Sequence, residues 1–207
     1  VIEGANTIKV TLHNGKSYDA KLVAADSQSD IAVIKISAEE LVPVTVDTKT
    51  NLSVGDLVVA IGNPLGTLAG TATEGIVSAL EREITLDGKT MTLLQISSSI
   101  NPGNSGGGVF DQYGNLVGLV VAKSSGSDVE GLGFAIPIDT VKKVSDSLIK
   151  EGYVEGRPSV GITILDLSSA EDAMKYGVSN TGVYINEVTS EAAKEAGLKS
   201  GSLEKNF

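Results

Sequence analysis

Hydrophobic and polar residues alternate near the start of the chain. Ile8, Val10 and Leu12 share one side of a short segment and are separated by polar residues, the period of two that is typical of a half-buried strand. Asn14-Gly15 follows, and this dipeptide is the strongest short signal for a hairpin turn. The pattern therefore predicts a second strand over residues 17–24 that pairs with the first.

Short runs of apolar and β-branched residues recur further along the chain, and Gly, Pro and Asn separate them. Many short strands at this spacing predict an all-β barrel or sandwich. The strands expected after the first hairpin are 31–36, 57–61, 71–79, 83–86, 90–96, 108–110, 116–122 and 132–136.

The hydrophobic period changes near residue 138. Ile138, Val141, Val144 and Leu148 follow helical spacing, and Asp139 is placed as the N-cap of the predicted helix. Glu151-Gly152 ends it, because glycine is the usual residue just past a helix C-terminus.

A polar stretch with Gly and Pro follows this helix and reads as a linker. A smaller unit comes next, near the lower size limit for independent folding. Its expected elements are a strand at 160–165, a helix at 169–176, a strand at 182–188 and a helix at 190–196, with Gly197 as a C′ cap. The predicted organisation is a first domain over 1–150, a linker over 151–158 and a second, partial unit over 159–207.

Composition narrows the function classes. The 207 residues include 16 Lys or Arg and 26 Asp or Glu, for a formal net charge of −10. This charge argues against a nucleic-acid partner, which requires a basic surface. The chain has no cysteine and a single histidine, His13, which excludes Cys-ligated metals and argues against a His-rich metal site. We therefore expect no metal and no cofactor.

The start of the chain carries no targeting signal. It begins at Val1, no charged and apolar leader follows, and no run approaches the roughly 18 apolar residues of a membrane span. We expect a processed or excised piece, with any signal or anchor upstream.

The densest chemical signal is the segment Ile100–Gly108. It places one serine, Ser105, among glycines in a predicted loop between strands. A nucleophilic serine needs a tight turn that exposes its hydroxyl, and backbone N–H groups that converge on the oxyanion. The segment also fits the nucleophile elbow of α/β-hydrolases. That interpretation fails because strands rather than a helix follow Ser105, and no histidine comes after it.

A second signal is an aspartate directly before an apolar strand. Asp30 precedes the run Ile31–Ile36, where a carboxylate at a barrel edge can orient a histidine and stabilise its imidazolium form. Taken alone, Asp30 is more simply interpreted as a turn or cap residue, and Ser105 as an incidental serine in a Gly-rich turn.

The two signals together resemble the HtrA/Deg-type serine proteases, which are trypsin-like double β-barrel enzymes with C-terminal PDZ domains. The resemblance covers nearly the whole chain. It implies a double β-barrel whose first strands are missing, followed by a partial PDZ domain of the α+β class. The supporting segments are Asn101–Gly107, Val1–Ala5, Ala60–Pro64, Thr73–Ser78 and Gly133–Pro137.

The resemblance assigns roles residue by residue. Ser105 matches the nucleophile, Asp30 the orienting acid, and the backbone N–H groups of Gly103 and Ser105 the oxyanion hole. Ile100, Val121 and Lys123 match the wall of the primary specificity pocket, and Val160, Gly161 and Ile162 the peptide-binding part of the PDZ unit, in which a peptide adds as a strand along a sheet edge.

The sequence departs from the family at the general base. The family's catalytic histidine stands immediately before the segment that matches Val1–Gly4, and this chain does not contain it. We interpret His13 as a surface residue at a turn. A Ser-Lys dyad with Lys123 is an alternative, although a solvated lysine after a strand is the simpler interpretation. We therefore expect no measurable peptidase activity from this chain by itself.

The resemblance implies a serine endopeptidase that cleaves unfolded proteins in protein quality control and stress response. It implies unfolded polypeptides and peptide C-termini as partners, a homotrimer in the intact protein, and an extracytoplasmic location, in the periplasm or at the cell surface. The alternative is a protease-like protein that binds peptides without cleaving them, and the missing histidine motivates it.

Overall fold

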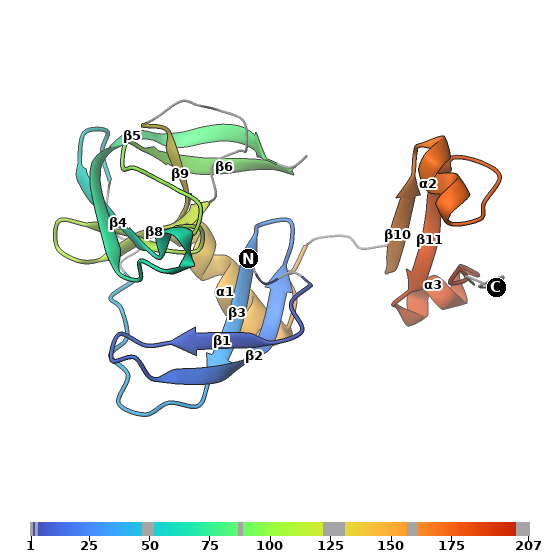
Figure 1. Cartoon of the computed structure of the whole chain (residues 1–207), viewed down its shortest axis with the longest axis horizontal. Helices are drawn as coiled ribbons and strands as arrows, with labels where there is room; N and C mark the ends of the chain where they lie inside the picture. Colours follow the sequence, from blue (N-terminus) through green and yellow to red (C-terminus); the bar gives the residue numbers. More distant parts are fainter. Residues whose placement is uncertain are drawn as a thin grey trace. The chain divides into compact units, whose positions relative to one another are not determined.

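The computed structural model describes residues 2, 4–46, 52–86, 89–121, 131–156 and 161–201. The chain forms two compact units, Val1–Glu155 and Gly156–Phe207, which Figure 1 colours from blue to orange and from orange to red. The boundary between them falls inside the segment 151–158 that the sequence marks as a linker.

The first unit begins with a three-stranded antiparallel sheet in the order β1-β2-β3. Its strands are β1 (Ile8–Thr11), β2 (Ser17–Asp26) and β3 (Ile31–Ile36). The predicted hairpin is confirmed: β1 pairs with β2, and the Leu12 N–H donates to the Lys16 carbonyl across the Asn-Gly turn, 2.8 Å away.

The remaining strands of this unit close into a barrel in the order β4-β5-β6-β9-β8-β7. The barrel strands are β4 (Leu57–Gly62), β5 (Thr71–Leu86), β6 (Lys89–Ile96), β7 (Gly108–Asp111), β8 (Leu116–Val121) and β9 (Gly133–Pro137). One sheet and one closed barrel agree with the trypsin-like all-β class expected from the sequence.

The prediction of two separate strands at 71–79 and 83–86 is wrong. A single strand, β5, runs through Leu80, Glu81 and Arg82 between them. Its register against β6 shifts between Val77 and Ala79 and again between Ala79 and Arg82. These irregularities interrupt the alternation of apolar residues without ending the strand, because a bulge inserts a residue while the ladder continues on both sides.

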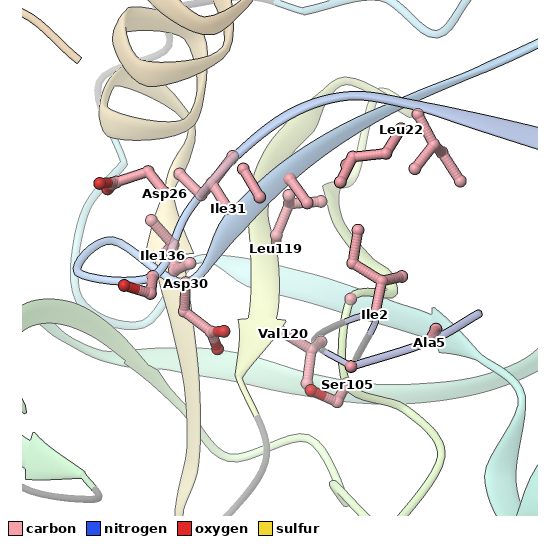
Figure 2. A pocket seen from close by; sticks show the side chains of 16 residues that line it. Ile2, Ala5, Leu22, Asp26, Asp30, Ile31, Ser105, Leu119, Val120 and Ile136 are labelled. Carbon is pink, nitrogen blue, oxygen red and sulfur yellow. The ribbon is translucent and has the colours of Figure 1, made fainter. Parts of the chain in front are cut away.

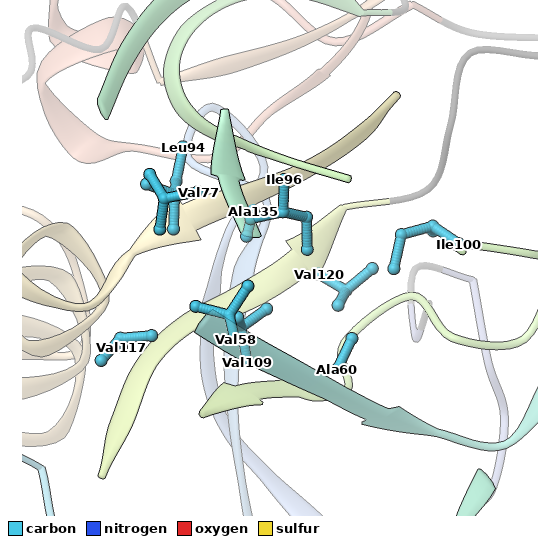
Figure 3. Packing of buried hydrophobic residues seen from close by; sticks show 10 residues of the cluster. All are labelled: Val58, Ala60, Val77, Leu94, Ile96, Ile100, Val109, Val117, Val120 and Ala135. Carbon is cyan, nitrogen blue, oxygen red and sulfur yellow. The ribbon is translucent and has the colours of Figure 1, made fainter. Parts of the chain in front are cut away.

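The barrel is filled by small and branched aliphatic side chains (Figure 3). Inward positions from β4 to β9 supply most of them, and Ile100 adds to the same cluster from the loop that carries Ser105. The side chain of Ile100 therefore anchors the start of this loop in the barrel core. The cluster consists of Val58, Ala60, Val77, Leu94, Ile96, Ile100, Val109, Val117, Val120 and Ala135.

Helix α1 (Ile138–Glu151) joins the sheet to the barrel. It contacts β2 and β3 as well as β8 and β9, and its apolar face packs into a second core cluster with Ile31 and Ile136. The prediction of Asp139 as N-cap is wrong. Pro137 holds that place in an extended conformation, and Asp139 lies in the first turn, where its charge still suits the helix dipole. Gly152 ends the helix in the left-handed conformation, as predicted.

The second unit pairs β10 (Ile162–Leu167) with β11 (Gly182–Val188) in an antiparallel sheet. Two short helices accompany it, α2 (Ala170–Lys175) and α3 (Glu191–Glu195), and serines cap both N-termini. The predicted start of this strand, Val160, lies outside the described residues, and β10 is described from Ile162. Gly161, directly before β10, has a φ of +70°, and its carbonyl accepts hydrogen bonds from the N–H groups of Thr189 and Ser190.

Within the described residues, no helix is both long enough and apolar enough to cross a bilayer. Within the same residues, no three or more His, Cys, Asp or Glu side chains cluster so that they could hold a metal ion.

A buried carboxylate organises the turn between β7 and β8. The Asp111 carboxylate accepts hydrogen bonds of 2.9 Å from the backbone N–H groups of Tyr113 and Asn115 and from Asn115 Nδ2. Burial by itself raises the pKa of the Asp111 carboxyl, but the hydrogen bonds from Asn115, Tyr113 and Gly114 together outweigh burial and leave this pKa below its ordinary value. The charged form is therefore favoured in the folded state.

Substituting Asp111→Asn is expected to destabilise the first unit at pH 7 by about 1–3 kcal/mol, because the new amide opposes the Asn115 amide. A lowered folded-state pKa contributes stability above the ordinary aspartate pKa of about 4, and this contribution is lost as the pH falls through the lowered value. The difference should therefore shrink between pH 7 and pH 2 in urea unfolding. Asp19→Asn, at an exposed position of β2, is the control, and an equal loss of stability at both pH values would contradict the assignment.

Candidate active site

Ser105 lies in a loop made of two successive turns between β6 and β7. Hydrogen bonds from the Asn104 N–H to the Asn101 carbonyl, 3.0 Å, and from the Gly107 N–H to the Asn104 carbonyl, 2.9 Å, close them. Each turn has a glycine with positive φ at its third position, +99° at Gly103 and +81° at Gly106. These are type II turns, which require that conformation. The predicted tight, glycine-dependent turn at Ser105 is confirmed.

The loop is held on both sides of the serine. The Gly106 N–H donates to the Val120 carbonyl, and the Val120 N–H donates to the Gly107 carbonyl, both at 2.8 Å. The Asn104 side chain is only 2% exposed and lies against Gly62, where a Cβ would come within 2.5 Å of Asn104 Oδ1. Ser105 is therefore fixed to β8 and β4, the kind of rigid support that a catalytic group needs.

Two backbone donors beside Ser105 have no acceptor within the described part of the chain. The Pro102 carbonyl accepts a hydrogen bond of 3.0 Å from the Leu65 N–H. Since the two ends of a trans peptide point in opposite directions, the Gly103 N–H is directed away from Leu65. Neither this group nor the Ser105 N–H donates to a described residue. Paired free N–H groups next to a serine are suited to bind a developing oxyanion.

Asp30 lies in the turn between β2 and β3. Its φ of +56° falls in the left-handed region, which aspartate tolerates better than most residues. On one side Ser29 is buried, and both its N–H and its hydroxyl donate to the Asp26 carboxylate. On the other side Ile31 is buried in the second core cluster. These neighbours hold the backbone of the turn on both sides of Asp30, whose own side chain is exposed.

A cavity of about 580 Å³ brings Asp30 and Ser105 together. Figure 2 shows the Asp30 carboxylate directed toward the part of the cavity where Ser105 lies, whereas the Asp26 carboxylate points away. Apolar side chains make up much of the rest of the wall, among them Leu22 and Leu119. The fold thus places Asp30 and Ser105, which are far apart in the sequence, in the wall of one cavity.

The cavity wall contains no histidine or lysine among the residues that the structure describes. His13 is exposed in the turn between β1 and β2 and is not among the lining residues. Its predicted surface position is therefore confirmed. The cavity wall holds two serines, Ser27 and Ser105, and two carboxylates, Asp26 and Asp30, and among the described residues it has no imidazole or amine that would take the Ser105 proton.

The residues predicted to line the specificity pocket and to bind a peptide in the second unit differ in burial. Ile100 is buried in the barrel core, and the Val121 side chain belongs to the cluster under α1. Lys123 and Val160 lie outside the described residues. Gly161 is buried, and Ile162 is half-buried at the start of β10.

Sequence reasoning missed the residues that support this site from other elements. Val120 anchors the loop through its backbone, and Leu65 holds the Pro102 carbonyl. The Asn-Pro-Leu-Gly segment at 63–66 is visible as a turn signal. Its contact with the serine loop, however, depends on the barrel that brings β4 beside β7.

Comparisons with known proteins agree with this geometry. The family model described as a trypsin-like peptidase domain matches residues 1–119. The chain is 41% identical over 213 residues to a "Serine protease Do-like HtrA" of Bacillus subtilis (strain 168), covering 96% of this chain and 47% of that protein. It is 38% identical over 215 residues to the "Putative serine protease HhoB" of Synechocystis sp. (strain ATCC 27184 / PCC 6803 / Kazusa), covering 98% of this chain and 51% of that protein.

A solved structure of the HtrA-type protease AlgW with a decapeptide is also similar. Its TM-score is 0.70 at 35% sequence identity, and the match covers 96% of this chain and 61% of that one. The chain spans about half the length of the curated relatives it matches.

Proposed function

Because this chain belongs to the trypsin-like peptidase family and is similar to HtrA-type serine proteases over nearly its whole length, we propose that it acts as a serine endopeptidase with Ser105 as nucleophile. The observation that carries this proposal is the single cavity lined by Ser105 and Asp30, next to the free Gly103 N–H. A peptide-binding scaffold alone would not need these groups together.

The reaction follows from the positions of these groups. Ser105 Oγ attacks the substrate carbonyl and transfers its proton to a base, and the Gly103 and Ser105 N–H groups hold the oxyanion of the tetrahedral intermediate. The base returns the proton to the leaving amine as the C–N bond breaks. Water, deprotonated by the same base, then hydrolyses the acyl-enzyme and restores the serine.

The base in this proposal is a histidine placed immediately before Val1, as the family resemblance implies. Ile2 and Gly4 both line the cavity, so a residue directly before this segment is within reach of Ser105 and Asp30. Asp30 would accept a hydrogen bond from the imidazole and stabilise its protonated form.

The substrates in this proposal are unfolded polypeptides. An extended chain presents its backbone to the serine loop, and the similar structure of the HtrA-type protease AlgW is one with a decapeptide. In the second unit, β10 pairs with β11 alone among the described strands, so its other edge suits a peptide that adds as a strand. An extracytoplasmic location, a homotrimer and a role in protein quality control are part of the same proposal.

The test supplies the missing base. A chain extended by Asn-His before Val1 is compared with a chain extended by Asn-Ala, and both are treated with a fluorophosphonate probe and with an unfolded protein substrate. The histidine should accelerate labelling of Ser105 by about 10²–10⁴-fold, the usual contribution of a positioned general base. Free imidazole should partly restore labelling of the Asn-Ala chain, because the cavity has room for the ring.

A non-catalytic peptide-binding protein is the second candidate, favoured by the absence of a described base in the cavity wall. If the Asn-His chain neither labels nor cleaves, while extended peptides still bind, the enzyme proposal is wrong and this candidate replaces it.

A further inference from the structure

Leu65 has a backbone conformation that leucine rarely adopts. Its φ is +58° and its ψ is 9°, a left-handed conformation that costs a side chain with a Cβ about 1–2 kcal/mol. Packing does not compensate, because the Leu65 side chain is 74% exposed. Strained backbone conformations of this kind cluster at functional sites.

Leu65 is the third residue of a type II turn. The Gly66 N–H donates to the Asn63 carbonyl at 3.0 Å, and Pro64 is the second residue. The same turn type occurs twice in the serine loop, where glycine takes the third position both times. Only the turn at 63–66 has a leucine there, so it bears a strain that the other two avoid.

The conformation of Leu65 sets the direction of its N–H. Type I and type II turns differ by a flip of the central peptide, which here is the Pro64–Leu65 peptide. In the observed turn the Leu65 N–H meets the Pro102 carbonyl at 3.0 Å. Pro102–Gly103 is itself the central peptide of the first turn in the serine loop, so the central peptides of two turns face each other.

The backbones of these two turns are in direct contact. A Cβ on Gly103 would lie 2.4 Å from the Asn63 carbonyl oxygen and 2.8 Å from the Leu65 nitrogen. The Asn63 N–H also points to the Gly103 carbonyl, at 3.4 Å. The turn is tied to β4 in its own right, since Pro64 is buried and the Gly70 N–H donates to the Gly62 carbonyl at 3.0 Å.

We propose that Leu65 is a positioning residue for the oxyanion hole: its N–H holds the Pro102 carbonyl, and this keeps the Gly103 N–H directed to the oxyanion. Pro102 and Gly103 are both exposed, and no other described group binds the Pro102 carbonyl. Without the Leu65 N–H, the Pro102–Gly103 peptide is free to flip and withdraw a donor. The kinetic part of this inference rests on the proposed function, whereas the hydrogen bond can be tested without it.

The kinetic experiment removes the Leu65 N–H in the Asn-His chain. Leu65→Pro deletes it but also changes φ, so a second variant replaces the Pro64–Leu65 amide by an ester, which deletes the N–H and leaves the side chain. Both should lower kcat by about 100-fold with KM within about twofold, since loss of one oxyanion donor costs about 10²–10³ in kcat. Leu65→Gly keeps the N–H and tolerates positive φ, so it should retain most of the activity, and Leu68→Ala, at an exposed side chain of the same loop, is the control.

An independent measurement uses nuclear magnetic resonance on the chain without added histidine. A scalar coupling across the hydrogen bond should connect the Leu65 nitrogen with the Pro102 carbonyl carbon, and the ester variant should shift the Gly103 amide resonance more than Leu68→Ala does.

An ester variant as active as the parent, or no such coupling, would overturn the inference. If the parent Asn-His chain is inactive while the coupling and the Gly103 shift appear, the proposed function fails and the positioning contact stands.

Discussion

Replacing Ser105 with alanine should lower the peptidase rate of the Asn-His chain by about 10⁶-fold, the loss measured when the nucleophile of a serine protease triad is removed. The reason is that, of the two serines in the cavity wall, Ser27 and Ser105, Ser105 is the one in the loop that carries the free Gly103 N–H. The measurement is the initial rate on an unfolded protein substrate, together with fluorophosphonate labelling.

The controls for this experiment separate chemistry from folding. Ser105 is half-buried, and its hydroxyl makes no hydrogen bond to a described residue, so its removal should leave the unfolding transition nearly unchanged. Ser145→Ala on α1 should keep full activity. Residual cleavage by Ser105→Ala at more than about a thousandth of the parent rate would mean that another group attacks the substrate.

Substituting Asp30→Asn should lower kcat by about 10⁴-fold, with little change in KM. An asparagine amide can present a donor where the imidazole needs an acceptor, so the histidine takes the wrong tautomer. Asparagine suits this test because it also tolerates the left-handed backbone observed at Asp30. The variant should therefore fold like the parent, and the kinetic loss can be assigned to the side chain.

The readouts for Asp30 are steady-state kinetics and urea unfolding of the same preparations. Asp19→Asn changes the net charge equally at an exposed position of β2 and serves as the control. A loss of less than about tenfold in kcat would show that Asp30 does not orient the base, even though it lines the cavity.

Local patterns predicted most elements of the fold. Alternation at Ile8, Val10 and Leu12 located the first strand, and Asn14-Gly15 located its turn. The errors occurred where a non-local contact overrides local preference. Strand β5 continues past Val77 because its bulges still pair with β6, and Pro137 rather than Asp139 precedes α1 because β9 runs directly into the helix.

For the candidate site, too, local sequence patterns predicted one part and the tertiary structure decided the other. Glycines at 103 and 106 indicate tight turns in any fold, and Asp30 before an apolar strand marks a sheet edge, so the sequence by itself determined the nucleophile, its turn and the orienting acid as candidates. It also established that His13 is the single histidine and lies at a hairpin turn.

Only the tertiary structure decided that Ser105 and Asp30 share one cavity and that the Gly103 N–H is left free. The first depends on α1, which packs the β1–β3 sheet and the barrel together. The second depends on the turn at 63–66, which is far from Pro102 in sequence and reaches it because β4 pairs with β7. Turn preferences act over a few residues, whereas the direction of one peptide in the serine loop is set by a hydrogen bond between two turns that the closed barrel brings together.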